Sequence, residues 1–335
     1  MKLASLKQGG RDGTLVVASR DLSRGVRASD VATTLQSALE DWVKCAPRLN
    51  RVYELLNESN AETINGEDVF ALDMRALAAP LPRAYEFVDG SAYLPHVERV
   101  RRARGAEVPK SFYTDPLMYQ ATSAGFLGPR DPIPVTSEDY GIDLEAEVVV
   151  VTDDVPMAVS AQRAAAHIQL VGLINDVSLR GLIPGELAKG FGFLQSKPRS
   201  ALSPVLVTPD ELGDAWRDSK LLLPMRTWIN GKWFGEADCG VDMQFSFAQL
   251  VAHAAKTRPL SAGCIVGSGT IANEDTSKGA SCLAEQRTVE TLRDGKPTTP
   301  FLKFGDTVRI EILDAHGKSI FGAIEQQVHQ ADTEK

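Results

Sequence analysis

The chain has 335 residues, of which 43% are hydrophobic and 24% are charged, and its formal net charge at pH 7 is −8. This composition is typical of a folded protein with room for one large domain and a smaller one. Apart from a basic cluster at residues 99–104, the negative charge argues against nucleic acid or an anionic membrane as a partner. The sequence contains no apolar stretch long enough for a membrane span and no signal-peptide core, so we expect a cytoplasmic protein.

The first part of the chain predicts a small α/β domain. A short strand is expected at residues 14–19, followed by a helix that Ser29 and Asp30 would cap and Pro47 would interrupt. The proline-stiffened stretch at residues 78–83 indicates a boundary. We therefore predict an N-terminal domain at 1–78, a larger domain at 79–330 and a disordered tail at 331–335.

The larger domain has mainly strand patterns. Residues 168–174 form an apolar run typical of a buried strand, and residues 222–229 and 232–236 flank Asn230 and Gly231, which predict a type I′ hairpin turn. The fold class predicted for the whole chain is therefore α+β and β-rich. The four cysteines have no metal-type spacing, so we expect free, buried thiols.

An acidic strand at residues 141–152 contains the strongest chemical signal. Successive strand side chains point to opposite sides, so Glu145 and Glu147 share one face beside an apolar run. Two unpaired buried carboxylates would cost several kcal/mol each, so we expect either a bound proton or a cation between them. Oxygen ligands favour a hard divalent ion such as Mg²⁺ or Ca²⁺.

Other candidate residues are scattered along the chain, and each also has an ordinary structural explanation. Asp89 and His96 lie seven residues apart, where a turn and a helix end would equally account for them. Asp176 follows the second buried strand and could cap a turn, whereas Lys197 alone would be a surface residue. The small-residue stretch at 267–272 lets the backbone approach a ligand closely.

Taken in order, these motifs resemble the fumarylacetoacetate hydrolase family, from Tyr85 to Val328. The motifs are Asp89 with His96, Glu145-x-Glu147, Asn175-Asp176-x-Ser178-x-Arg180, Lys197 before Ser203-Pro204, and the 267–271 turn followed by Glu285. The N-terminal part is most similar to the compact bacterial fumarylacetoacetase type. The resemblance implies a mixed, rolled β-sheet in the C-terminal domain and a homodimer.

The resemblance also implies roles for individual residues. One Mg²⁺ or Ca²⁺ ion would be bound by Asp89, Glu145, Glu147 and Asp176. His96 and Glu285 would activate water, and the substrate would contact Arg180, Lys197, Thr270 and Tyr119. Two positions depart from the full-length eukaryotic members, because Ile183 and Ser91 stand where those members carry Gln and Tyr.

The activity implied is metal-dependent hydrolysis of a carbon–carbon bond in a small diketo-dicarboxylic acid. The first candidate is 4-fumarylacetoacetate, giving fumarate and acetoacetate in tyrosine and phenylalanine catabolism. The alternatives are hydrolysis of an acylpyruvate such as fumarylpyruvate, and decarboxylation or isomerisation in the homoprotocatechuate pathway. His96 paired with Glu285 favours hydrolysis, because decarboxylation needs no activated water. A non-enzyme that binds a metal and a diacid is the alternative from another class.

Overall fold

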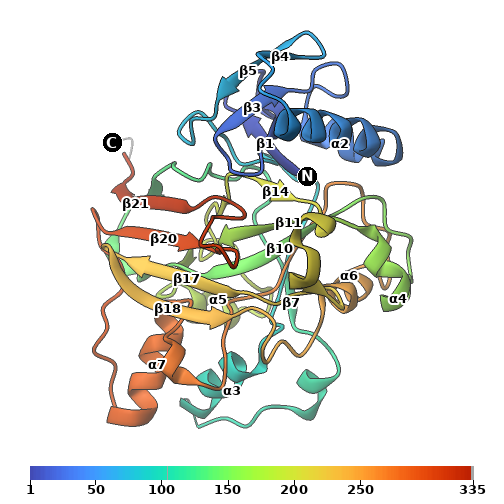
Figure 1. Ribbon diagram of the computed structural model, residues 1–335. Coiled ribbons are helices and arrows are strands. Elements are labelled where there is room, and N and C mark those ends of the chain that lie inside the picture. The colour runs from blue at the N-terminus through green and yellow to red at the C-terminus, as the bar shows by residue number, and fades with distance from the viewer. Residues whose placement is uncertain (104, 333–335) are drawn as a thin grey trace.

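The computed structural model describes residues 1–103 and 105–332 (Figure 1). Arg104 of the basic cluster and residues 333–335 of the predicted tail lie outside this part of the chain. None of the helices in the described part combines the length and the apolarity that a membrane span requires. The fold is α+β and rich in strands, as predicted.

Most elements in the described part of the chain are strands, with helices between them. The strands are β1 (Lys2–Leu6), β2 (Thr14–Ala18), β3 (Arg24–Arg27), β4 (Thr63–Ile64), β5 (Glu67–Ala71), β6 (Phe87–Gly90), β7 (Met118–Gln120), β8 (Ile133–Val135), β9 (Ile142–Asp143), β10 (Ala146–Thr152), β11 (Ile168–Asn175), β12 (Ser178–Leu179), β13 (Ala201–Leu202), β14 (Leu206–Val207), β15 (Trp216–Arg217), β16 (Lys220–Leu221), β17 (Pro224–Ile229), β18 (Lys232–Asp238), β19 (Ile265–Gly267), β20 (Thr307–Glu311) and β21 (Ile324–Gln330). The α-helices are α1 (Leu35–Leu39), α2 (Trp42–Glu58), α3 (Leu94–Ala103), α4 (Ala161–Ala164), α5 (Ile183–Leu187), α6 (Phe247–Ala254) and α7 (Leu283–Asp294). Short 3₁₀ helices are η1 (Lys110–Tyr113), η2 (Glu138–Tyr140), η3 (Ala165–His167), η4 (Pro209–Ala215) and η5 (Thr276–Lys278).

A twelve-stranded sheet connects the N-terminal part with the rest of the molecule. Its strands lie in the order β4-β5-β3-β2-β1-β14-β11-β10-β19-β6-β7, and β13 pairs with β11 beside this path. Strand β1 is antiparallel to β14, with Leu3 opposite Leu206. The sheet is therefore continuous across the predicted division at residue 78, which stays a prediction as a domain boundary.

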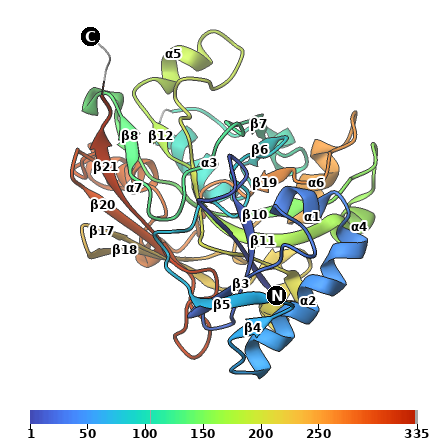
Figure 2. The same ribbon diagram turned by 90° about the horizontal axis from the view of Figure 1, so that it is seen from above.

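A second sheet of five strands, in the order β18-β17-β20-β21-β8, packs against the first. Side chains alternate along its strands, so Ile310 and Val328 face inward and share a core with Val148 and Val150 of β10. Burying such a side chain stabilises the fold by about 1.5–3 kcal/mol. The outward positions of β20 and β21 are polar, and the view from above shows these two strands at the edge of the molecule (Figure 2).

The helices of the N-terminal part differ from the prediction. Helix α1 begins after Thr34, whose hydroxyl accepts a hydrogen bond from the Ser37 amide, so Ser29 and Asp30 cap nothing. Helix α2 continues through Pro47. Proline there lacks only the hydrogen bond to the carbonyl of Val43, which lies on the exposed side of the helix, where water can solvate it.

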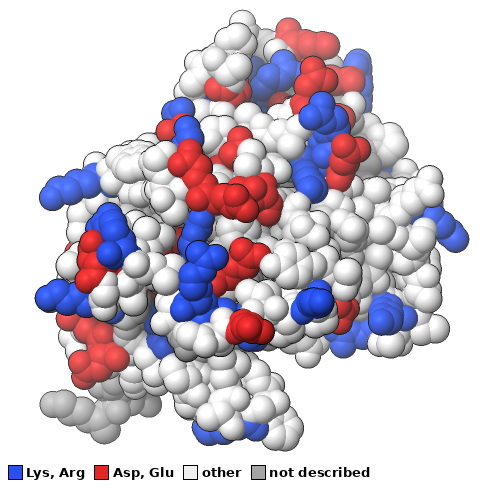
Figure 3. Space-filling model, turned by 90° about the horizontal axis from the view of Figure 1, so that it is seen from below, with Lys and Arg blue, Asp and Glu red and all other residues white. Residues whose placement is uncertain are grey.

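Two other predictions are confirmed. Strands β17 and β18 form a hairpin in which Asn230 and Gly231 have φ of 52° and 70°, the left-handed values of a type I′ turn. The four cysteines are free and buried. On the face seen from below, Lys and Arg side chains lie among Asp and Glu, so the surface charge there is mixed (Figure 3).

Candidate active site

Three carboxylates converge where neighbouring strands of the large sheet end. Asp89 belongs to β6, Glu147 to β10, and Asp176 directly follows β11. Strand β10 pairs with β11 and β19, and β19 pairs with β6, so the sheet itself brings the three residues together. One oxygen of each lies within 4.8 Å of the others, and all three side chains are buried.

Glu147 has an unusual environment. Its side chain is 0% exposed, and neither carboxylate oxygen meets a hydrogen-bond partner among the described residues. Burial and the nearby carboxylates of Asp89 and Asp176 raise the pKa of Glu147 well above its usual range, and burial raises the pKa of Asp89 to about 7. An orphaned buried carboxylate facing two others is a set of oxygen donors that fits a divalent cation.

Glu145, two residues earlier, accepts hydrogen bonds at both of its carboxylate oxygens. Its Oε1 accepts a hydrogen bond from Arg180 Nη2 at 2.7 Å, and its Oε2 accepts from Lys197 Nζ at 2.5 Å and from Ser178 Oγ at 3.0 Å. Burial tends to raise the pKa of Glu145, but the cations of Arg180 and Lys197 hold it below its usual range. Glu145 therefore lies beside the three-carboxylate cluster without being one of its members.

Lys197 connects the two groups of acids. Its Nζ also donates to Asp176 Oδ2 at 2.6 Å, and that carboxylate accepts further hydrogen bonds from Tyr119 Oη at 2.8 Å and Ser200 Oγ at 2.5 Å. The Lys197 side chain is 5% exposed. Burial disfavours the ammonium, yet Asp176 and Glu145 raise the pKa of Lys197 above its usual value, so it remains a cation.

The segment before Lys197 is held by a carboxylate that the sequence did not single out. Glu186 of α5 accepts hydrogen bonds from the backbone amides of Leu194, Gln195 and Ser196, and from Ser196 Oγ at 2.5 Å. Although burial raises the pKa of Glu186, these donors, the Ser196 hydroxyl first, lower it to about 2. Helix α5, which carries Glu186, projects from the body of the molecule (Figure 2).

Arg180 connects the acidic strand to helix α7. Its Nε donates to Asp143 Oδ2 at 2.8 Å, while its Nη2 binds Glu145. Asp143 in turn accepts hydrogen bonds from the amides of Leu283 and Ala284 at the start of α7. Asp143 was not predicted as a site residue, although its position two residues before Glu145 places it on the same alternating pattern.

His96 and Glu285 lie together as a pair. His96 follows β6 on helix α3, and its Nδ1 lies 2.5 Å from Glu285 Oε2 on α7. Arg99 Nη1 donates to the other oxygen of Glu285 at 2.5 Å, and Arg99 Nη2 donates to the carbonyls of Asn273 and Glu274. Burial raises the pKa of Glu285, but His96 and Arg99 outweigh it and keep this carboxyl below its usual range. Arg99 was not predicted as a site residue, because it lies in the basic cluster. Its position three residues after His96 on a helix could have indicated it, since such residues are neighbours on the helix surface.

The glycine-containing turn after β19 gives room to Asp89. A Cβ at Gly267 would lie 2.3 Å from Asp89 Oδ1, and a Cβ at Gly269, with φ of +75°, would lie 2.3 Å from the carbonyl of Gly90. The Gly269 amide donates to Asp89 Oδ1 at 3.1 Å. The next residue, Thr270, has a buried hydroxyl without a partner among the described residues, so it is free to bind a ligand.

Sequence comparison identifies two families along the chain. Residues 86–329 match the family described as fumarylacetoacetate (FAA) hydrolase C-terminal, and residues 1–83 match fumarylacetoacetase N-terminal domain 2. A 2,4-didehydro-3-deoxy-L-rhamnonate hydrolase of Sphingomonas sp. (strain SKA58) is 27% identical over 202 residues, which cover 59% of this chain and 62% of that protein. A Burkholderia ambifaria protein described as a hydrolase is 29% identical over 212 residues, 62% of this chain and 64% of that relative. The match thus covers less than two thirds of the length of these curated relatives.

Solved structures share the fold. A maleylpyruvate hydrolase of Sphingobium sp. SYK-6, in complex with manganese (II) ion and pyruvate, has a TM-score of 0.66 at 15% identity, covering 99% of this chain and 100% of that one. A fumarylacetoacetate hydrolase of Exiguobacterium antarcticum has a TM-score of 0.63 at 17% identity, covering 98% and 99%. These identities show the fold alone; the match of residues 86–329 shows the family. The chain belongs to the fumarylacetoacetate hydrolase family.

Proposed function

We propose that this protein is a divalent-metal-dependent hydrolase that cleaves a carbon–carbon bond in a β-diketo acid. The observation that carries this proposal is Glu147, which is fully buried beside Asp89 and Asp176 and has no hydrogen-bond partner among the described residues. A carboxylate in this position requires a proton or a cation. His96, on the helix that follows β6, and Glu285 supply the base that hydrolysis needs.

The proposed ligands are Asp89, Glu147 and Asp176, whose oxygens suit Mg²⁺, Ca²⁺ or Mn²⁺. Glu145 is the fourth predicted ligand; its carboxylate already accepts hydrogen bonds from Lys197, Arg180 and Ser178, and Oε1 keeps one acceptor site. When bound, a divalent ion supplies Lewis acidity toward the keto oxygens of the substrate.

His96 is the proposed general base. Because its Nδ1 is bound to Glu285, the tautomer with the proton on Nδ1 leaves the Nε2 lone pair free to take a proton from water. Glu285, kept ionised by His96 and Arg99, then stabilises the imidazolium. The water oxygen adds to the carbonyl carbon beside the bond to be cleaved. When the carbon–carbon bond of this adduct breaks, the acyl part leaves as a carboxylic acid, and the departing enolate carbon takes the proton from Nε2, so the base is regenerated.

Three side chains are proposed to bind the substrate's oxygens. Lys197 uses two N–H groups on Glu145 and Asp176, and the third can donate to a developing enolate oxygen. The free hydroxyl of Thr270 provides another donor. Arg180 would contact the substrate through Nη1, which binds no described residue, and the ring of Tyr119 forms a wall beside Lys197.

The first proposed substrate is 4-fumarylacetoacetate, in tyrosine and phenylalanine catabolism. An acylpyruvate such as fumarylpyruvate is the second, because Ile183 and Ser91 replace substrate-contacting residues of the eukaryotic family members. We also propose a homodimer, which sedimentation at several protein concentrations tests.

The test is the loss of ultraviolet absorbance of fumarylacetoacetate and of fumarylpyruvate, with Mg²⁺ or Mn²⁺ and after EDTA. The proposal predicts EDTA-sensitive loss of the first substrate, abolished in His96→Ala. Loss of the second alone would keep the mechanism and change the substrate. Loss of neither, or full activity in His96→Ala, would overturn the hydrolase assignment in favour of a decarboxylase, an isomerase or a binding protein.

A further inference from the structure

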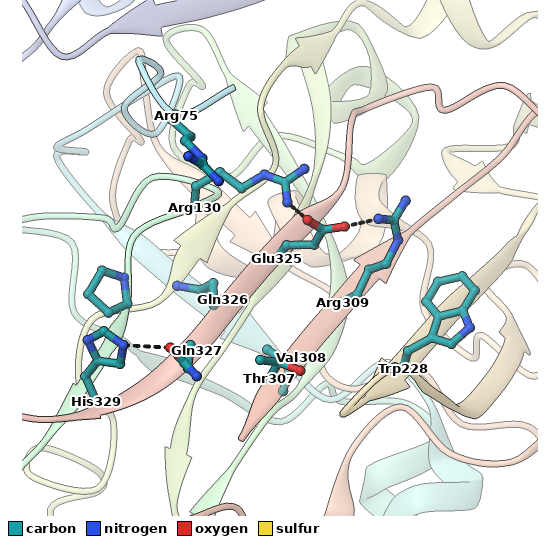
Figure 4. A pocket seen from close by; sticks show the side chains of 12 residues that line it. Arg75, Arg130, Trp228, Thr307, Val308, Arg309, Glu325, Gln326, Gln327 and His329 are labelled. Atoms are coloured by element: carbon teal, nitrogen blue, oxygen red, sulfur yellow. Dashed lines mark hydrogen bonds and ion pairs between the residues drawn. The ribbon is translucent and has the colours of Figure 1, made fainter. Parts of the chain in front are cut away.

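A separate cavity of about 720 Å³ opens beside the five-stranded sheet (Figure 4). Its walls come from distant parts of the chain: Arg75 after β5, Arg130 before β8, Trp228 of β17, Arg309 of β20, and several residues of β21. None of these is a residue of the candidate active site. The volume lies within the range of about 300–1,000 Å³ that small-molecule sites occupy.

The cavity has more positive than negative charge. Three arginines line it against one carboxylate, Glu325, which forms ion pairs with both Arg130 and Arg309 (Figure 4). Arg309 also pairs with Glu311 at 2.5 Å. The guanidinium of Arg75 has no hydrogen bond or ion pair to any residue that the structure describes. In a protein with a net charge of −8, guanidinium groups gathered in one hollow indicate an anionic ligand.

The glutamate gives the arginines a defined arrangement. Glu325 lies directly opposite Arg309 in the β20–β21 pair, and Arg309 lies opposite Trp228 in the β17–β20 pair. A row of three cross-strand neighbours therefore crosses the sheet face, with Arg130 at its far end. Because Glu325 binds two guanidinium groups at once, both are held in place and keep N–H donors for another anion.

The two ends of the cavity differ in chemistry. The Trp228 ring lies at one end, 5.7 Å from the guanidinium carbon of Arg309, and offers a flat apolar face. Arg75 and Arg130 lie at the other end (Figure 4). The ion-paired Glu325 and Arg309 lie between the two ends, and the neutral side chains of Thr307 and Gln327 line the cavity to one side of them (Figure 4). A ligand that fills this shape has a planar ring and, some distance from it, an anionic group.

We propose that this cavity binds a small organic anion that joins a planar ring to a phosphate or carboxylate. The ring packs against Trp228 and Arg309, and the anionic group receives hydrogen bonds from Arg75 and Arg130. Guanidinium groups suit both anions, because their paired N–H donors match two oxygens of either. Arg75 belongs to the N-terminal part, so the bound ligand connects that part to the five-stranded sheet.

Calorimetric titration of the full chain in EDTA, at fixed ionic strength, tests this site with four probes. Adenosine monophosphate and benzoate carry a ring and an anion, adenosine carries only the ring, and pyrophosphate only the charge. We expect adenosine monophosphate or benzoate to bind more tightly than adenosine and pyrophosphate, and whichever of the two binds identifies the anion as phosphate or carboxylate. EDTA excludes binding through a metal in the candidate active site.

Two variants assign the binding to this cavity. Arg75→Met removes a guanidinium without breaking any described ion pair, and we expect it to weaken binding on the order of tenfold. Trp228→Leu should weaken the binding of the ring-bearing probe and leave the binding of pyrophosphate unchanged. Arg51→Met, on the exposed side of α2, is the matched control and should bind as the wild type does. No binding of either ring-bearing anion at millimolar concentration, or equal affinity in Arg75→Met and Arg51→Met, would overturn the proposal.

Discussion

Glu145 lies directly before β10 and Glu147 lies within it, yet the two side chains occupy opposite electrostatic environments. Glu145 is bound by Arg180, Lys197 and Ser178, and its pKa lies below the usual range. Glu147 has no partner among the described residues, and its pKa lies well above the usual range. Both side chains are buried, so burial alone does not separate them.

The difference shows that the buried acids divide into two groups. The compensated group is Asp143 and Glu145, which Arg180 and Lys197 neutralise and which fixes helix α7 against the sheet. The second, uncompensated group contains Asp89, Glu147 and Asp176, where Lys197 reaches only Asp176. In this account the compensated group stabilises the fold, and the uncompensated group keeps a place for a cation. The predictions below separate these two roles.

The largest effect is expected from removing a cation of the compensated group. Arg180→Met leaves Asp143 and Glu145 without their shared partner inside the protein. Breaking such a buried pair costs about 3–5 kcal/mol of unfolding free energy. Urea unfolding in EDTA measures this loss of unfolding free energy. The control is Arg51→Met, because the exposed ion pair of Arg51 with Glu54 contributes about 0.5 kcal/mol or less. If Arg180→Met lowers the unfolding free energy as little as the control does, the division into compensated and uncompensated acids is wrong.

Without metal, we expect substitutions of the two glutamates to change the unfolding free energy in opposite directions. Glu147→Gln removes a carboxyl whose pKa burial and the neighbouring carboxylates raise well above its usual range, so it should raise the unfolding free energy at neutral pH in EDTA. Glu145→Gln removes the partner of Arg180 and Lys197 and should lower it. Thermal unfolding of both variants gives the comparison. If both variants shift in the same direction, the two residues do not differ as described.

Arg99 gives a prediction about catalysis rather than stability. Without its guanidinium, Glu285 loses one of its two partners and is less firmly oriented toward His96. We expect Arg99→Met to lower kcat on the order of tenfold with little change in KM. The acidic limb of the rate profile should move to higher pH, because Arg99 is one of the groups that hold the pKa of Glu285 below its usual range. Arg99→Lys should restore part of the activity.

Arg101→Met on the same helix is the control for that experiment. Arg101 stacks on Phe112 and donates to the carbonyl of Glu107, and it does not contact Glu285. Its rate profile should match that of the wild type. An unchanged profile in Arg99→Met would show that Glu285 is held by other groups.

The smallest effect concerns the segment that carries Lys197. The pKa of Glu186 is lowered from 4.5 to about 2, so its contribution to stability is complete above pH 4.5 and is lost as the pH falls toward 2. Glu186→Gln should therefore reduce the unfolding free energy by about 1 kcal/mol at pH 7, and the difference should vanish near pH 2. Denaturant unfolding across this range measures it. Glu62→Gln, at an exposed glutamate, should show no such trend, and a difference that persists at low pH would contradict the assignment.

The strand-rich fold and the family could be predicted from the sequence, because they depend on local residue patterns and on the order of motifs along the chain. Alternation in the sequence of residues 141–152 indicated Glu145 and Glu147, and the Asn230-Gly231 pair predicted the hairpin of β17 and β18. Local patterns gave the wrong start for the N-terminal helix: Thr34 caps α1, whereas Ser29 and Asp30 were predicted to do so.

Tertiary partners could not be read from the sequence. Nothing local distinguishes Glu145 from Glu147, because their difference comes from Arg180 and Lys197, which reach only the first of them. The same holds for the arginine-lined cavity, where Arg75 and Arg309 meet from opposite ends of the chain. Such clusters arise only when the two sheets are assembled.

The central claim is that Asp89, Glu147 and Asp176 hold one divalent cation. Calorimetric titration of metal-free protein with Mn²⁺ or Mg²⁺ tests it most directly, in the wild type and in Glu147→Gln. The account predicts one ion per chain in the wild type, with affinity reduced by at least about tenfold in the variant. Equal affinity in the two proteins, or no binding to the wild type, would contradict it.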